Sequence, residues 1–210
     1  MPVSTPRWVV AAKAAVWAAC LAPFLLLFLR AVEFQGLTLG ADPVQEVLNV
    51  CGKTGLNLLL LTLSITPIRR STGFNRLISF RRLLGLFAFF YVVLHFATYL
   101  ALDLGFAWGH VLEDIAKRPY ITVGFTALLL LIPLAATSTN RLQRALGRNW
   151  VKLHRLIYVI AILGVIHFWW QVKRDISEPL LYAFLLTVLL GVRLHHAWTL
   201  RSKRMAHAAQ

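Results

Sequence analysis

The stretch WVKLHRLIYVIAILGVIHFWW, residues 150–170, decides the fold, because it is apolar and long enough to cross a membrane. His154 lies at its start and His167 lies near its end. An ionisable side chain inside lipid is costly, so intramembrane histidines indicate a functional site. Haem iron would account for them, because neutral imidazole is a standard axial ligand and a helix bundle offers an apolar slot for the porphyrin. The alternative is that both histidines only form hydrogen bonds between helices.

The composition is that of an integral membrane protein. Of the 210 residues, 59% are hydrophobic and 14% are charged, whereas a soluble domain has about 25% charged residues. The formal net charge is +14, but the basic residues lie in short clusters between apolar runs, as the positive-inside rule describes. We therefore expect no nucleic-acid partner. Cys20 and Cys51 have neither CxxC nor zinc-site spacing, so we interpret them as packing residues.

Apolar runs of about 20 residues, the length of a transmembrane helix, predict an all-α integral membrane bundle of six helices in a single domain, residues 1–210. The predicted spans are 8–29, 48–67, 83–102, 120–136, 154–170 and 180–198. Pro67 and Pro119 are expected at helix ends, because proline breaks the helical hydrogen-bond ladder. We expect no internal repeat, and we find no nucleotide-binding or nucleophile motif.

The charges predict the orientation of the bundle. Sixteen of the 22 Lys and Arg residues lie in the N-terminal segment, the 68–82 and 137–153 loops, the C-terminal tail and the adjoining helix ends. The positive-inside rule places these segments, and with them both termini, in the cytoplasm. All eight acids lie in the three opposite loops: Glu33, Asp42, Glu46, Asp103, Glu113, Asp114, Asp175 and Glu178.

Two histidines are expected at the same depth on different helices. His95 lies thirteen residues beyond Arg82, and His167 lies thirteen residues beyond His154. At 1.5 Å per residue, each lies roughly 20 Å from the cytoplasmic end of an outward-running helix. Two imidazoles at one depth are what a haem with two axial histidines requires.

The partner of His154 at the inner depth stays open. Arg81 occupies that depth on the third span, but a guanidinium is a poor ligand because it is always protonated. His195, His196 and water are the other candidates. Thirteen residues place His154 and His167 about 140° apart on an ideal helix. They therefore serve different clefts, or the helix deforms near Gly164.

Four runs of the sequence resemble the MsrQ (formerly YedZ) family, the haem-binding membrane subunits of a bacterial periplasmic methionine sulfoxide reductase system. They are LTLSITPIRR (61–70), RRLLGLFAFFYVVLHFATYLALD (81–103), DIAKRPYITVG (114–124) and LGRNWVKLHRLIYVIAILGVIHFWW (146–170). The resemblance covers a ferric reductase-like core at about residues 50–195. It implies one or two haems b with His95, His154 and His167 as axial ligands, and Arg81 standing where oxidase relatives have a further histidine.

The resemblance also implies a place in the bacterial inner membrane and a function. Electrons would come from quinol or a cytoplasmic flavin reductase, and would pass to the periplasmic molybdopterin enzyme MsrP, which repairs oxidised methionines. FMN and quinone are the further cofactors that it allows. The chain would then be an electron-transfer component and not the catalytic subunit.

Two rival functions remain, a haem or metal transporter and a membrane ferric reductase that acts directly on an outside metal. The expected absence of repeats disfavours the transporter. For the electron-transfer function, the outer loops are too short to form a catalytic domain, so we expect the acceptor to be a separate protein. We expect it to dock on the Asp103–Lys117 and Lys173–Glu178 loops. The arginine-rich side would face the electron donor and anionic lipid.

Overall fold

The computed structural model describes residues 6–172 and 175–208, so Lys173, the start of one expected docking loop, lies outside the described part. Within these residues the chain is helical and contains no strand. Six helical segments are long and apolar enough to cross a membrane, which confirms the predicted all-α membrane bundle. They are Arg7–Ala31, Pro43–Thr72, Asn75–Asp103, Pro119–Ala136, Arg148–Gln171 and Ser177–Lys203.

The first half of the chain contains α1 (Arg7–Ala31), η1 (Phe34–Gly36), α2 (Pro43–Thr72), η2 (Asn75–Phe80), α3 (Arg81–Thr98) and the π-helical turn η3 (Tyr99–Asp103). The second half contains α4 (Trp108–Lys117), α5 (Pro119–Ala136), α6 (Asn140–Leu146), α7 (Arg148–Leu153), α8 (Leu156–Gln171) and α9 (Ser177–Ala208). The amphipathic helix α4 was not predicted.

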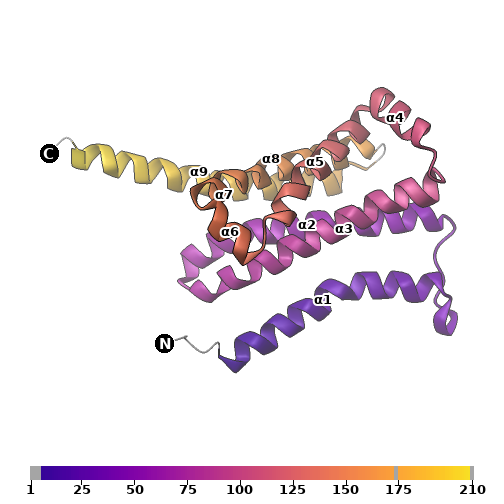
Figure 1. Ribbon diagram of the computed structural model, residues 1–210, viewed down its shortest axis with the longest axis horizontal. Helices are drawn as coiled ribbons and strands as arrows, with labels where there is room; N and C mark the ends of the chain where they lie inside the picture. Colours follow the sequence, from indigo (N-terminus) through magenta and orange to yellow (C-terminus); the bar gives the residue numbers. More distant parts are fainter. Residues whose placement is uncertain (1–5, 173–174, 209–210) are drawn as a thin grey trace.

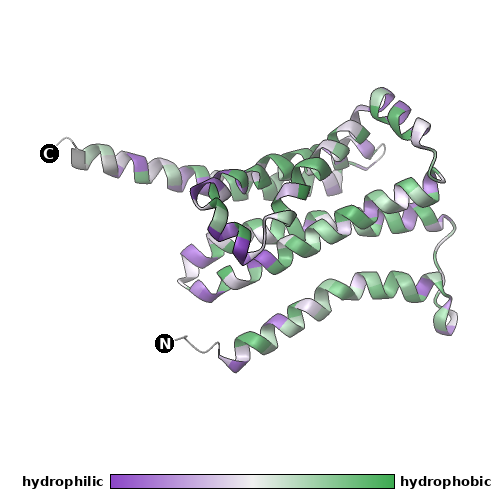
Figure 2. Ribbon diagram, in the orientation of Figure 1, coloured by the Kyte–Doolittle hydropathy of each residue, from purple (hydrophilic) through white to green (hydrophobic). Residues whose placement is uncertain are grey.

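The centre of the bundle is formed by two helix pairs, α2 with α3 and α5 with α8, while α9 lies beside α8 and α2, and α1 lies at the edge (Figure 1). Both ends of the chain lie at the same end of the bundle (Figure 1). Apolar residues cover the long helices, and hydrophilic ones gather toward the helix ends (Figure 2). Cys20 and Cys51 are buried and unbonded, as expected of packing residues.

We name the two ends of the bundle by their charges. The acidic end carries all eight carboxylates of the chain. It also holds every ion pair found among the described residues, which are Arg30–Glu46, Lys53–Glu178, Lys117–Glu113 and Arg118–Asp114. Among the described residues, the opposite, arginine-rich end contains no Asp or Glu side chain, so its cations form no ion pair with a side chain there.

Proline did not act as expected in α2. Helix α2 begins where Asp42 accepts a hydrogen bond from the Gln45 backbone N–H at 3.0 Å, and it ends at Gly73 with a φ of 70°. It continues through Pro67, so the expectation that Pro67 ends a helix is wrong. Pro119 does begin α5, as predicted.

The helix break in the fifth span also differs from expectation. Helix α8 is continuous through Gly164, and the break lies at His154 and Arg155, between α7 and α8. A Cβ on Gly164 would lie 3.4 Å from the Leu56 side chain, so glycine there allows close packing without bending the helix. The expected deformation near Gly164 is therefore wrong, and His154 lies outside the helix that carries His167.

A tyrosine hydroxyl connects α1 to the bundle. Pro23 lies inside α1, and one turn of its hydrogen-bond ladder is opened beside it. The Tyr91 hydroxyl of α3 fills this opening, because it accepts from the Phe24 N–H at 3.0 Å and donates to the Cys20 carbonyl at 2.7 Å. Since Tyr91 is fully buried, neither backbone group can find water in its place.

Tyr91→Phe is therefore expected to lower the free energy of unfolding by about 1–3 kcal/mol, the cost of leaving buried polar groups unpaired. Thermal unfolding of the purified protein in detergent measures the change. Tyr182→Phe is the control, because its hydroxyl bonds an exposed partner, Asn57, at 2.8 Å. Equal melting temperatures for the two variants would contradict the role assigned to Tyr91.

Candidate functional site

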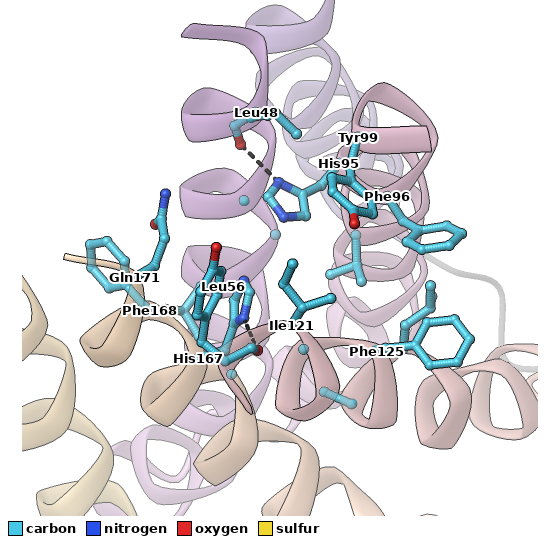
Figure 3. Close-up of a pocket in the computed structure, with 18 of the residues that line it drawn as sticks. Leu48, Leu56, His95, Phe96, Tyr99, Ile121, Phe125, His167, Phe168 and Gln171 are labelled. Atoms are coloured by element: carbon cyan, nitrogen blue, oxygen red, sulfur yellow. Dashed lines mark hydrogen bonds between the residues drawn. The ribbon is translucent and has the colours of Figure 1, made fainter. Parts of the chain in front are cut away.

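The site lies in the central four-helix bundle, where His95 of α3 faces His167 of α8 (Figure 3). Their ring centroids are 6.1 Å apart, and their planes cross at 83°. An imidazole nitrogen binds a first-row metal at about 2 Å, so two imidazoles on opposite sides of one metal have ring centroids roughly 6 Å apart. The two rings therefore have the spacing of a pair that shares one metal ion.

Backbone carbonyls set the tautomer of both histidines. His95 Nδ1 lies 2.9 Å from the Leu48 carbonyl oxygen of α2, and His167 Nδ1 lies 2.7 Å from the Tyr120 carbonyl oxygen of α5. A carbonyl oxygen only accepts, so each Nδ1 must carry the hydrogen and donate it. This leaves Nε2 of each ring with a free lone pair, and in Figure 3 these nitrogens lie on the facing sides of the two rings. A metal-binding histidine is commonly held in this way.

Each histidine ring lies against a glycine on the neighbouring helix. A Cβ on Gly52 of α2 would lie 3.1 Å from His95 Nδ1, and one on Gly124 of α5 would lie only 2.7 Å from His167 Nδ1. The second contact is shorter than side chains tolerate, so only glycine fits at position 124. The two glycines therefore fix how closely each ring approaches its carbonyl.

The two halves of the site repeat one arrangement. In both, the histidine bonds a carbonyl 47 residues earlier in the chain. In both, the glycine beneath the ring lies four residues after that carbonyl. The pairs α2–α3 and α5–α8 thus hold their histidines through the same local spacing. The equal separation from glycine to histidine, in Gly52–His95 and Gly124–His167, was the sequence pattern that could have indicated this shared arrangement.

A cavity of about 250 Å³ surrounds the facing rings. Its wall combines small residues with apolar ones, among them Gly52, Gly55, Gly164, Leu59 and Leu131. Within the described residues no three or more His, Cys, Asp and Glu side chains come together as a metal cage. Two axial nitrogens suffice for haem, because the porphyrin supplies the other ligands. The residues present therefore fit haem better than a bare metal ion.

The rim of the cavity at the acidic end is charged. Arg118 and Lys53 line the cavity, and each is paired with a carboxylate, Arg118 with Asp114 at 3.1 Å and Lys53 with Glu178. Lys117, which pairs with Glu113 at 2.5 Å, does not line it. A hydrogen bond with the Tyr120 side chain, together with the charge of Asp114, raises the pKa of the Arg118 guanidinium. The rim thus offers cationic side chains that could pair with a haem carboxylate, in competition with their present carboxylate partners.

His154 lies apart from this pair, at the arginine-rich end. Its Nε2 is 3.1 Å from the Thr137 hydroxyl, and its ring stacks on Trp150 at 3.9 Å. The Thr137 hydroxyl donates to the Pro133 carbonyl at 2.6 Å, so it must accept from His154.

The other candidates lie on α9. His195 is exposed and His196 is half-buried. No hydrogen bond or ring contact joins either side chain to His154 among the described residues.

A membrane bundle with two facing histidines is typical of the class of transmembrane haem-binding proteins. The sequence matches the family described as ferric reductase like transmembrane component over residues 51–165, a range that includes His95 and His154 and ends just before His167.

Closer relatives carry the name protein-methionine-sulfoxide reductase heme-binding subunit MsrQ. The chain is 53% identical to the one from Xanthomonas campestris over 96% of its own length and 94% of the relative's. Identity is 54% with the one from Xanthomonas axonopodis, over 97% and 94% of the two chains. It is 48% with the one from Ralstonia nicotianae, over 92% and 89%. The chain therefore belongs to the MsrQ family, and it is a multi-pass membrane protein.

Proposed function

We propose that this protein is the haem b electron-transfer subunit of a methionine sulfoxide reductase system, with His95 and His167 as axial ligands of one haem. The observation that carries the proposal is the pair of rings 6.1 Å apart, each with its Nδ1 hydrogen held by a carbonyl. Haem b in this position supplies a one-electron iron couple within the membrane.

The protein's own residues prepare the site in three ways. The carbonyls of Leu48 and Tyr120 orient the two rings and increase their basicity as ligands. Gly52 and Gly124 allow the rings to reach those carbonyls. The apolar wall, with Leu59 and Leu131, would limit the access of water and lower the dielectric around a bound haem.

The proposed direction of transfer follows the charges. The arginine-rich end would lie in the cytoplasm of the bacterial inner membrane, with quinol or a flavin reductase as donor. The acidic end would face the periplasm, where the molybdopterin enzyme MsrP would accept the electrons. The expected docking surface includes the loop from Asp103 to Lys117, next to the cavity rim. Charge complementarity there would mainly increase the encounter rate. FMN and quinone as further cofactors stay predictions.

Inside-out vesicles test this proposal. A quinol or a flavin reductase added outside should reduce the haem, and MsrP sealed inside should reoxidise it once methionine sulfoxide is present. Haem that stays reduced with active MsrP and substrate would contradict the proposal. Uptake or release of haem by the same vesicles would favour a transporter, and direct reoxidation by ferric ions without MsrP would favour a ferric reductase.

We propose a second, inner haem site at His154, with Arg81, His195, His196 or water opposite. The expected result is two haems per chain in the wild type and one in His154→Ala, measured as haem per protein after purification. The hydrogen bond to Thr137 and the stacking on Trp150 describe the competing role, in which His154 only joins α5 to α7. One haem per chain in both proteins would establish that competing role.

A further inference from the structure

Arg193 of α9 is a half-buried cation within the membrane-spanning part of the bundle. One arm of its guanidinium donates to the Leu63 carbonyl of α2, and the other donates to the Leu189 carbonyl of its own helix at 3.0 Å. The guanidinium also lies over the Tyr158 ring of α8, 5.5 Å from its centroid. The charge is thus directed into the junction of α2, α8 and α9, where all three contacts are neutral.

Pro67 explains one of these contacts. The Leu63 carbonyl would normally bond the N–H four residues later, but Pro67 has none. Arg193 supplies the missing donor. A neutral donor would satisfy that carbonyl equally well, so the positive charge of Arg193 is not accounted for by this bond.

Within the described part of the chain, no Asp or Glu side chain pairs with Arg193, and its surroundings add positive charge. Arg70 lies seven residues beyond Leu63 on α2, about two turns along the same face of that helix. All eight carboxylates of the chain belong to segments at the acidic end. A cation held partly out of water without a counter-charge is unfavourable. An anion beside Arg193 would therefore stabilise this arrangement.

Depth and shape indicate which anion fits. Arg193 is sixteen residues into α9, about 24 Å along the helix axis, whereas the hydrocarbon core of a membrane is about 30 Å thick. Arg193 thus lies close to the boundary where lipid phosphates are found. Ile68 of α2 and Val192 of α9 expose large apolar side chains near this position, as a surface in contact with acyl chains does. Arg193, Arg81 and Arg70 do not line the histidine cavity.

We propose that Arg193, with Arg70, binds the headgroup of an anionic phospholipid at the junction of α2 and α9, in the leaflet that covers the arginine-rich end. Basic pockets between transmembrane helices bind lipid headgroups in this way. The lipid would join α9 to α2 next to the carbonyl that Pro67 leaves open. This inference does not depend on haem binding.

Native mass spectrometry of the full-length protein in detergent, titrated with phosphatidylglycerol or phosphatidylcholine, tests the proposal. Arg193→Gln is expected to weaken phosphatidylglycerol binding about five- to tenfold, as removal of a cation near a headgroup does. Arg193→Lys should retain most of the affinity for phosphatidylglycerol, because the lysine ammonium also binds a phosphate, as a point charge. Arg201→Gln is the matched control, since it removes the same charge from an exposed position on the same helix.

A second variant keeps the bond between Arg193 and the Leu63 carbonyl, so that weaker lipid binding cannot be attributed to misfolding. Arg70→Gln changes an exposed residue and leaves Arg193 in place, and we expect a loss of about two- to fivefold without a change in melting temperature.

Three results would overturn the proposal. The first is that Arg193→Gln and Arg201→Gln bind phosphatidylglycerol equally well, or that the wild type binds phosphatidylcholine as strongly as phosphatidylglycerol. The second is saturable binding of inorganic phosphate or FMN that depends on Arg193, because it would assign the site to a soluble phosphate. The third is loss of haem from Arg193→Gln with lipid binding unchanged, because it would assign the charge to a haem carboxylate.

Discussion

Replacing either His95 or His167 with alanine is expected to abolish the low-spin, six-coordinate spectrum of one haem, because each ring supplies one of its two axial nitrogens. The two rings are the only imidazoles that face each other among the described residues. The haem content of that site should fall by about tenfold or more, as for loss of a metal ligand or its support. Optical spectra and haem quantification of purified variants measure both changes.

His110→Ala is the matched control, since this histidine lies on α4 and lines a separate surface hollow at the acidic end. It should leave the spectrum unchanged. Full retention of the six-coordinate signal in both His95→Ala and His167→Ala would remove these residues from the site.

Gly124→Ala is expected to have almost as large an effect, although it removes no ligand. The added Cβ would lie 2.7 Å from His167 Nδ1 and 2.8 Å from its Cε1. The ring must move away, which breaks its bond to the Tyr120 carbonyl and displaces Nε2 from the metal position. Losses of about 10- to 100-fold in metal affinity are typical when such a supporting contact is broken.

A graded series makes this prediction specific. Gly52→Ala should cause a smaller loss, because its Cβ would meet His95 at 3.1 Å. Gly191→Ala on α9 should cause none, since no atom lies within 4 Å of its Cβ position. Haem affinity measured by titration of the purified apoprotein should therefore fall in the order Gly191→Ala, Gly52→Ala, Gly124→Ala. An equal loss in all three variants would show a general effect of alanine on the helices.

The pairing of His95 with His167 could be predicted from the sequence, because depth along a regular helix follows from residue counting. The charges at the helix ends supplied a common reference level, from which the depths of His95 and His167 on two different spans could be counted. The same counting could not describe His154, because it assumed one straight helix from 154 to 170. The chain instead breaks at His154 and Arg155, where no proline or glycine marks the change.

Other parts of the site depend on contacts that the hydropathy pattern does not contain. Carbonyl acceptors such as those of Leu48 and Tyr120 are backbone atoms, so their residue types carry no information. Gly124 is one of several glycines in apolar spans, and only the position of α8 shows that it must lack a side chain. Pro67 was expected to end α2, but a donor from α9 removes the penalty of the unpaired carbonyl.

Electron paramagnetic resonance of the oxidised, purified protein tests the central claim most directly. Each imidazole acts by π donation on the iron orbital perpendicular to its own plane, so planes that cross at 83° act on two iron orbitals almost equally. The expected result is a strongly anisotropic low-spin ferric signal that disappears in both His95→Ala and His167→Ala. Absence of this strongly anisotropic signal from the wild type, or its survival in both variants, would contradict the assignment of these two histidines to one haem.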